Sequence, residues 1–505
     1  MAQTFAGLGK NIFLWEEVNG KFKKNRQVLW GDWLEIDDNR NAQRGHIPII
    51  WAKNDPDNRM ELWIPEQDTT PDRPLEIIFV DVGQGDGCVL ISPERDIDER
   101  IMVIDAGEGD NMCRFLNERF KTYRGFDFHA AILTHPDKDH YLGFKDVFED
   151  HKIGFEHLYH NGLMELPVSG SFEKVGGTQE DTTHGITYVN HLWQTHEEVK
   201  LNFSDNSSFD DFEYPPVIHA ALNNPKINNI SIMSTRHGTQ ENGRSYLHGF
   251  SPSDPVQYDI EVLGPVVEEN SSGEPKLRKI SSYSETKNGH SVLLRLTYGN
   301  YKIFFGGDLN KPAEEFLLRH YTGQKTLPKH QGPTYDAVVA KARERFRSEV
   351  MKTCHHGAAD VTDLFLDAVN PACFVISSGD QEGHVHPRPD LLGRLGRFGR
   401  GESPVILSTE LQRSTRELES QKEVEKLLEL IDVLHDSPTE KRKEVIKKHI
   451  EMLARNNVDV YGAIYVKTNG ERLITAFKKE TLSKTNRWFY FEYTIDQLGV
   501  LEVVK

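Results

Sequence analysis

Short apolar runs recur along the chain, and several of them lead directly into acidic or histidine residues. The runs at residues 75–82, 101–104, 130–133 and 301–305 are rich in aliphatic or aromatic side chains and are bounded by polar or glycine-containing turns. Such runs predict buried strands, whereas residues 311–320 carry apolar side chains at helical spacing. The pattern predicts an α/β fold whose strands carry polar side chains to one edge of a sheet, where α/β proteins place their sites.

Residues 1–73 have a different rhythm, with short β-rich runs separated by polar turns, and predict a separate small β module. This segment holds five of the chain's seven Trp residues, and its motif W-G-D-W at residues 30–33 resembles bacterial Src-homology-3-like barrels. The aromatic side chains can form the core of a small domain or a binding groove, and the core is the expected role. The polar, proline-containing stretch 66–74 marks the boundary of the module.

The remainder divides into a predicted catalytic domain and two later segments. Residues 74–411 hold the regular strands and helices, but about 161–255 are irregular and rich in polar residues, which predicts an insertion or lid. Residues 412–457 are charged and carry apolar residues at helical spacing. They predict a helical hairpin that either docks on the body or forms an interaction surface. Residues 458–505 predict strands that return to the catalytic domain.

The composition is that of a soluble and rather polar protein. The chain has 505 residues and a mean hydropathy of -0.56, and no run approaches the roughly 18 apolar residues of a membrane span. The N-terminus has no signal-peptide pattern and the four Cys form no C-x-x-C motif, so we expect a cytoplasmic protein with reduced thiols and no membrane partner. The net charge of -18 opposes broad attraction to nucleic acid but leaves room for a small basic site.

The densest chemistry follows the apolar run 130–133. His135, Asp137, Asp139 and His140 place two imidazoles and two carboxylates within six residues. In a core these groups would be desolvated and the carboxylates would repel each other, whereas one or two divalent metal ions would satisfy all four. The alternative is a polar loop after a strand.

Similar residues follow other apolar runs, which favours the metal interpretation. Asp105 comes directly after the run that ends at Ile104, and Asp308 ends the motif G-G-D. His355 and His356 stand in K-T-C-H-H-G, and His386 follows a further predicted strand and turn.

The order of these residues resembles the metallo-β-lactamase superfamily, whose signature H-x-H-x-D-H appears here as H-x-D-x-D-H. The stretches V-I-D-A-G, L-T-H-P-D-K-D-H and K-T-C-H-H-G, with F-V-D-V-G-Q-G-D at residues 79–86, are similar to the β-lactamase-like domain of ComEC-type DNA-uptake proteins. ComEC-type proteins also carry membrane spans, which we do not expect here. The resemblance implies an αββα sandwich with metal ions at the strand-end rim. The N-terminal small β-barrel and the C-terminal helical hairpin insertion, which lie outside the resemblance, complete the expected α/β fold.

The resemblance also implies a ligand set for two divalent metal ions. The first ion would be held by the first His and Asp of the H-x-D-x-D-H cluster and the second ion by its second Asp and His, with the Asp of G-G-D bridging them and a histidine of H-H-G completing the second site. The expected metal ligands are His135, Asp137, Asp139, His140, Asp308, His355 and His356. The expected ions are Mn²⁺ or Zn²⁺, and an Asp in place of the usual second His favours Mn²⁺.

Further roles follow from the same resemblance. The expected catalytic residues are Asp105, Asp139, Asp308 and His386. Asp105 would orient a ligand histidine, and His386 would face a substrate phosphate or donate a proton. Substrate contacts are expected from Lys352, Arg388 and His290; the last stands near the place where the superfamily usually has another histidine ligand.

The function implied is a metal-dependent phosphodiesterase, specifically a nuclease acting on DNA through a hydroxide that bridges two metal ions. Arg388, Arg394, Arg397 and Arg400 can form a track for nucleic-acid phosphates or a solvated helix face. The same ligands permit a metallohydrolase of a small ester, lactone, thioester or cyclic nucleotide, which the net charge of -18 favours. A third interpretation is a non-catalytic scaffolding protein with a structural metal site, which would recruit a protein partner through the N-terminal module or the helical hairpin.

Overall fold

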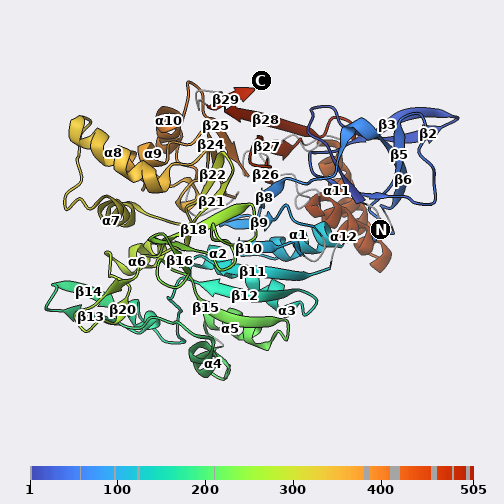
Figure 1. The fold of residues 1–505 in the computed structure, drawn as a ribbon. Helices are drawn as coiled ribbons and strands as arrows, with labels where there is room; N and C mark the ends of the chain where they lie inside the picture. Colours follow the sequence, from blue (N-terminus) through green and yellow to red (C-terminus); the bar gives the residue numbers. More distant parts are fainter. Residues whose placement is uncertain are drawn as a thin grey trace.

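The computed structural model describes residues 3–56, 58–95, 98–121, 125–209, 211–379, 386–409, 421–455, 463–479, 483–495 and 501–504. The chain is a mixed α/β protein, as predicted, with two large sheets and a further sheet built by the N-terminal residues (Figure 1). No helix among the described residues combines the length and the apolar character needed to cross a membrane.

The first large sheet contains ten strands: β8 (Leu75–Phe79), β9 (Gly87–Ile91), β10 (Ile101–Ala106), β11 (Asp127–Leu133), β12 (Gly154–His160), β15 (Ile227–Ile232), β26 (Ile464–Thr468), β27 (Leu473–Lys478), β28 (Trp488–Ile495) and β29 (Leu501–Val504). Their order is β15-β12-β11-β10-β9-β8-β26-β27-β28-β29. Strands β10, β11, β12 and β15 are parallel, so their carboxyl ends meet at one edge. The C-terminal strands join this sheet because β26 pairs with β8.

The second large sheet contains eight strands: β16 (Thr239–Glu241), β17 (Arg244–Tyr246), β18 (Tyr258–Gly264), β21 (Leu293–Tyr298), β22 (Tyr301–Phe305), β23 (Val350–Lys352), β24 (Cys373–Ile376) and β25 (Val405–Ser408). Their order follows the chain, β16-β17-β18-β21-β22-β23-β24-β25. Alternate residues of the two sheets, such as Ile77 and Ile303, share one buried core. The two sheets therefore pack on each other, because successive side chains of a strand point to opposite faces.

Helices cover the other face of each sheet. Ile78, next to Ile77, belongs to a core shared with α1 (Asn111–Phe120), α3 (Phe144–Glu149), α4 (His196–Phe203) and α5 (Tyr214–Asn223). Phe304, next to Ile303, belongs to a core shared with α7 (Lys311–Thr322), α8 (Pro333–Phe346), α9 (Asp363–Val369) and α10 (Pro389–Phe398). The remaining elements are α2 (Lys138–Tyr141), α6 (Tyr283–Gly289), the 3₁₀ turns η1 (Glu66–Asp68), η3 (Phe172–Val175) and η4 (His355–Gly357), and the strand pairs β13 (Thr178–Asp181) with β14 (Ile186–Val189) and β19 (Glu268–Glu269) with β20 (Pro275–Lys276).

The N-terminal module is a seven-stranded sheet with a small core of its own. Its strands are β1 (Gln3–Ala6), β2 (Phe13–Val18), β3 (Lys21–Gln27), β4 (Trp33–Ile36), β5 (His46–Trp51), β6 (Met60–Pro65) and β7 (Thr69–Thr70). Trp30 packs in the core between the ten-stranded sheet and its helices, and Lys467 Nζ of β26 donates to the Trp30 carbonyl at 2.7 Å. One aromatic residue of the W-G-D-W motif therefore joins the module to the body, while an Src-homology-3-like barrel stays a prediction.

Two predicted segments have a definite place in the fold. The segment about 161–255, predicted as an irregular insertion, supplies α5 and the edge strand β15 of the ten-stranded sheet, and β16 and β17 of the other sheet. The segment 412–457, predicted as a helical hairpin, contains α11 (Gln421–Asp436) and α12 (Glu440–Arg455). Residues 412–420 and 456–457 of that prediction lie outside the described residues.

Candidate metal centre

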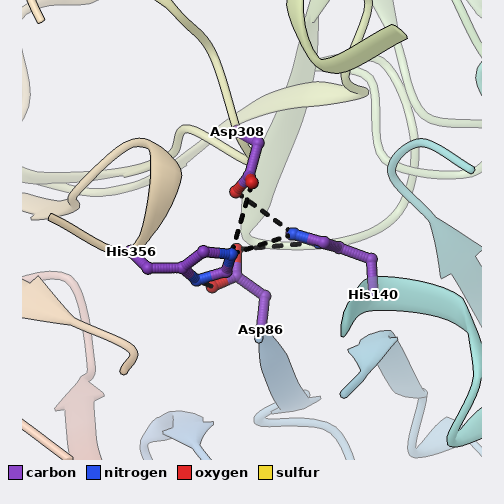
Figure 2. Close-up of side chains that lie close together, drawn as sticks. All are labelled: Asp86, His140, Asp308 and His356. Atoms are coloured by element: carbon purple, nitrogen blue, oxygen red, sulfur yellow. Dashed lines mark hydrogen bonds and ion pairs between the residues drawn. The ribbon is translucent and has the colours of Figure 1, made fainter. Parts of the chain in front are cut away.

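Four buried side chains from separate segments meet at the rim of the two large sheets (Figure 2). Asp86 lies in the turn between β8 and β9, and His140 lies in α2, which follows β11. Asp308 follows β22, and His356 lies in η4 after β23. One ligand atom of each residue lies within 4.8 Å of the others, and none of the four is more than 7% exposed. This cluster can hold a metal ion.

The shortest distances in the cluster join two imidazoles and a carboxylate. His140 Nε2 lies 3.3 Å from His356 Nε2. Asp308 Oδ1 lies 3.1 Å from His140 Nε2, and Asp308 Oδ2 lies 3.2 Å from His356 Nε2. Atoms that each bind one divalent ion at about 2.0–2.1 Å are separated by about 2.8–3.4 Å along the edges of an octahedral or tetrahedral shell. These three spacings are therefore the ones expected around a single cation.

The opposite nitrogens of the two rings fix which atoms face the centre. His140 Nδ1 lies 2.7 Å from Asp105 Oδ2, and His356 Nδ1 lies 3.1 Å from both Asp86 Oδ1 and the Ser377 carbonyl oxygen. These partners accept hydrogen bonds, so each Nδ1–H donates. In a neutral imidazole the Nε2 atom then carries a lone pair. Two lone pairs would face each other among carboxylates, and only a cation, either a proton or a metal ion, relieves that repulsion.

The local charges show how strongly the centre attracts cations. Burial disfavours charge on His140, but the carboxylates of Asp308 and Asp105 raise the pKa of its imidazole well above the usual value. Asp308 and Asp86 likewise raise the pKa of buried His356. A divalent ion bound between these rings would take the place of protons, because histidine ligates metals in its neutral form.

Asp139 supplies a second carboxylate on the Nε2 side of His356. Its Oδ2 atom lies 3.2 Å from His356 Nε2. Although Asp139 is largely buried, this contact holds the pKa of its carboxyl well below the usual value. The groups that face the centre are thus His140, His356, Asp139 and Asp308. Two imidazoles with two carboxylates are ligands that suit Zn²⁺ and Mn²⁺.

Asp86 and Lys352 form a buried pair behind His356. Asp86 contacts Nδ1 of His356 and so orients the ring, as Asp105 does for His140. Lys352, only 4% exposed, binds the Asp86 carboxylate through its ammonium group and donates to the Gly307 carbonyl at 3.1 Å. Lys352 was expected to contact substrate; the structure places it behind the centre, where it balances the charge of Asp86.

The backbone of the surrounding loops is shaped to bring these groups together. Gly85 has a φ of +104°, and a Cβ atom there would lie 1.7 Å from the carbonyl oxygen of Asp139. Only glycine lets the Asp86 loop approach α2 so closely. His355 and His356 have φ values of 49° and 51°, which are uncommon for residues with a side chain and occur preferentially at functional sites.

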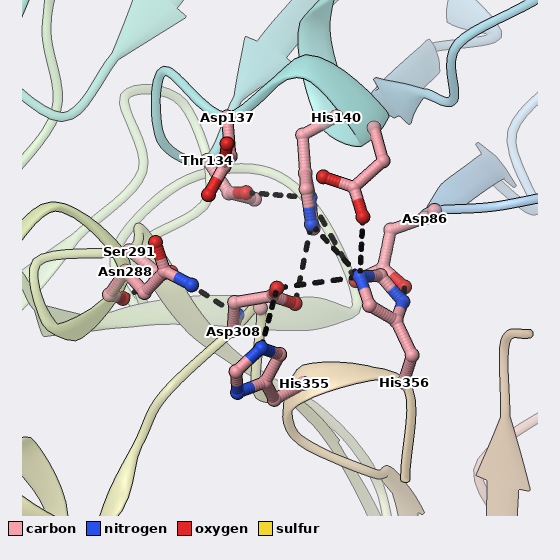
Figure 3. A network of polar contacts seen from close by, with 12 residues as sticks. Asp86, Thr134, Asp137, His140, Asn288, Ser291, Asp308, His355 and His356 are labelled. Atoms are coloured by element: carbon pink, nitrogen blue, oxygen red, sulfur yellow. Dashed lines mark hydrogen bonds and ion pairs between the residues drawn. The ribbon is translucent and has the colours of Figure 1, made fainter. Parts of the chain in front are cut away.

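His135 and His355 lie beside the cluster, and each has a buried ring nitrogen without a hydrogen-bond partner among the described residues. The ring of His135, fully buried, lies 4.1 Å from that of His140 between centroids, and its Nε2 atom has no hydrogen-bond partner among the described residues. Nδ1 of His355 is also buried without a hydrogen-bond partner there, and its Nε2 lies 3.9 Å from Asp308 Oδ2 (Figure 3). A buried polar atom without a partner is costly, so these nitrogens suit a further ligand.

Asp137, expected as a ligand with His135, lies outside the four-residue cluster. Its carboxylate caps α2 and forms an ion pair with Lys287, with Oδ1 3.2 Å from Nζ. Lys287 also lies 3.3 Å from Glu165 Oε1. In this arrangement Asp137 is engaged by a cation of the protein itself, and its expected role as a ligand stays a prediction.

The other expected site residues are not members of the four-residue cluster. The rings of His386 and His355 lie 6.0 Å apart between centroids. Arg388 is exposed at the start of α10, and its backbone N–H donates to the Gly357 carbonyl at 2.9 Å. His290 is buried with Nε2 2.7 Å from the Arg278 carbonyl oxygen, and burial lowers its pKa to about 4. The imidazole of His290 is therefore engaged by the backbone carbonyl group of Arg278.

Sequence reasoning missed the roles of Asp86, Thr134 and Ser291. The Thr134 backbone N–H and hydroxyl both donate to Asp105, at 2.8 and 2.7 Å, and hold that carboxylate against His140. The Asp308 backbone N–H donates to Ser291 Oγ at 3.1 Å. A usable signal existed only for Asp86, because it follows an apolar run and a glycine turn as the other site residues do.

Comparisons with known proteins leave the family open. The chain matches no protein-family model, and a search of curated proteins finds no match. The resemblance to the metallo-β-lactamase superfamily thus rests on the motifs of the sequence alone.

Proposed function

We propose that this chain is a metal-dependent phosphodiesterase, and specifically a nuclease that acts on DNA. The observation that carries the proposal is the pair of Nε2 atoms, of His140 and His356, that face each other at 3.3 Å beside Asp308. A structural role alone does not explain why two imidazoles and several carboxylates are buried together where the strands of two sheets end.

The arrangement of layers supports the same proposal. Two sheets share one core, and helices pack on the outer face of each. This layering is compatible with the αββα sandwich that the sequence motifs imply, and the candidate centre lies where strands of both sheets end. We propose that the chain has the metallo-β-lactamase fold on this basis, together with the motif order.

The residues present fit a metal ion, and some would bind the ion while others orient its ligands. His140, His356, Asp139 and Asp308 would hold one ion, and the spare Nε2 atom of His135 would contribute to a second. Divalent ions in such a site activate water and stabilise charge on a phosphoryl oxygen. Asp105 and Asp86 keep the two imidazoles in the tautomer that ligates metal.

Two histidines at the outer side of the centre are placed to meet a substrate. The His355 side chain is 31% exposed and stands beside Asp308. His386 lies next to it. An imidazole N–H of either residue can donate a hydrogen bond to a phosphate or a proton to a leaving group.

A second candidate, hydrolysis of a small ester or cyclic nucleotide, is favoured by the charges near α2. Burial raises the pKa of Glu108, and the carboxylates of Asp139, Glu213 and Asp137 outnumber the opposing ammonium group of Lys138. A cluster of like charges beside the centre opposes the approach of a long polyanion. In addition, Arg394 and Arg400 of the predicted phosphate track are paired with Asp363 and Glu349, at 2.7 and 2.8 Å.

The test is cleavage of labelled single- and double-stranded DNA with added Mn²⁺ by the wild type and by Asp308→Ala. The control is Glu197→Ala, which removes an exposed carboxylate of α4. Cleavage by the wild type and the control but not by Asp308→Ala supports the nuclease. Metal-dependent hydrolysis of bis(p-nitrophenyl) phosphate or of a cyclic nucleotide, without cleavage of DNA, supports the second candidate. Equal cleavage by all three proteins refutes the proposed site.

A further inference from the structure

The hairpin of α11 and α12 exposes apolar side chains that a folded chain normally covers. Leu428 is 56% exposed, Ile431 42% and Val433 47%, and on α12 Val445 is 44% and Ile450 49% exposed. Five of the nine large apolar side chains found exposed in the described residues thus lie on this hairpin.

The described side chains of the hairpin, between residues 426 and 450, are mostly exposed. Among the described side chains between residues 426 and 450, only Ile446 is buried. Leu427, Leu430 and Leu434 are half-buried at helical spacing, as expected for the seam between α11 and α12. Leu428 and Ile431 lie on a second stripe of α11, which α12 of the same hairpin leaves uncovered.

The two helices carry opposite charges. Helix α11 has five acidic and two basic residues, a net charge of -3, whereas α12 has six basic and three acidic residues, a net charge of +3, with His neutral. Glu429 and Asp432 flank the apolar stripe of α11, and Lys447 and Lys448 flank Val445 and Ile450 on α12. Each helix is therefore complementary to the other helix of an identical hairpin.

We propose that a second copy of this chain covers the hairpin, so that two hairpins form a four-helix bundle with twofold symmetry. In this bundle α11 of one copy lies against α12 of the other, because pairing α11 with α11 would join two helices of charge -3. A twofold interface repeats each contact, so both pairs of helices gain the same complementarity. The interface buries the stripe of Leu428 and Ile431 of each copy against α12 of its partner, which itself exposes Val445 and Ile450.

The dimensions of the hairpin suit this assembly. Its helices have 16 residues each and are joined by a connection of three residues. At 1.5 Å per residue each helix is about 24 Å long. Antiparallel helices with short connections and apolar stripes are the components of four-helix bundles. The hairpin is thus a dimerisation element separate from the candidate metal centre.

The first test is the molar mass of the full chain in solution, measured by light scattering. The wild type is expected to be a dimer, and Leu428→Asp with Ile431→Asp is expected to be a monomer with unchanged circular dichroism. Leu201→Asp, at an apolar residue that is 85% exposed on α4, is the matched control and should stay a dimer. A monomeric wild type at tens of micromolar overturns the proposal, as does a dimer that survives the double substitution.

A charge exchange tests the pairing of the helices. Glu429→Lys with Asp432→Lys makes α11 basic, and Lys447→Glu with Lys448→Glu makes α12 acidic. Each variant alone should be monomeric, because like charges then face each other in both pairs of helices. An equimolar mixture should form a heterodimer, since the basic α11 of one variant meets the acidic α12 of the other. Two dimeric variants, or a mixture that stays monomeric, overturn this arrangement.

Discussion

A buried carboxyl group in α7 predicts a pH dependence of stability. Glu314 of α7 is fully buried, its Oε2 accepts a hydrogen bond from the Thr362 backbone N–H at 2.5 Å, and its Oε1 has no hydrogen-bond partner in the described structure. Burial raises the pKa of Glu314 from 4.5 to about 8. The folded protein therefore keeps this proton at neutral pH, whereas the unfolded chain loses it.

The sign and the size of the effect follow from this difference. Below pH 4.5 both states hold the proton, so Glu314 and a glutamine in its place are equivalent. As the pH rises from 4.5 towards 8, only the unfolded state loses the proton, and the stability that Glu314 confers falls. Each pKa unit corresponds to about 1.4 kcal/mol, so the full shift to about 8 amounts to on the order of 4–5 kcal/mol.

The assay is chemical denaturation of Glu314→Gln and the wild type between pH 5 and pH 9. We expect the two free energies of unfolding to be similar near pH 5, and the variant to become the more stable as the pH rises, with no further change above about pH 8. Glu315→Gln is the matched control, because the neighbouring Glu315 side chain is 39% exposed. A difference between the variant and the wild type that does not change with pH would refute the reasoning.

Three further predictions concern the candidate centre. Asp105→Asn should lower Mn²⁺ affinity by about 10–100-fold, because His140 loses its charged hydrogen-bond acceptor. Asn tolerates the positive φ of this position, so the backbone can be kept. Unchanged affinity in a calorimetric titration would contradict this role of Asp105. Lys352→Met should remove the ammonium partner of buried Asp86, leaving His356 to balance its charge, and should destabilise the metal-free protein by about 3–5 kcal/mol. Equal thermal midpoints of variant and wild type would show that the Lys352–Asp86 pair is dispensable. Mn²⁺ binding should release protons from His140 and His356 and weaken as the pH falls; binding heats that are the same in buffers of different ionisation enthalpy would exclude proton release.

The sequence predicted the α/β class and several residues of the centre because both depend on local pattern. Apolar runs that end in Asp or His mark strands that reach a common rim, and this signal located His140, Asp308 and His356. The pairing of Asp86 with His356 joins residues far apart in the chain, and it depends on how two sheets pack. Spacing along one strand carries no information on that contact.

Two parts of the chain were harder to interpret from their sequence. The edge strand β15 reads I-N-N-I-S-I, which is too polar to stand out as a buried strand, and helix α5 begins with two prolines after an acidic tract. Strand β15 is held by its pairing with β12, and α5 by its packing on the ten-stranded sheet. At Asp137, the spacing suggested a metal ligand, but the nearby Lys287 comes from α6, and no local pattern predicts that ion pair.

The most direct test of the proposed centre compares two carboxylates that stand two residues apart. Asp139 contacts His356 Nε2 at 3.2 Å, whereas Asp137 is paired with Lys287. The measurement is Mn²⁺ binding to wild type, Asp139→Asn and Asp137→Asn by titration calorimetry. We predict that Asp139→Asn loses most of the affinity and that Asp137→Asn retains it. The reverse result, or no binding by the wild type, would contradict a metal centre between His140 and His356.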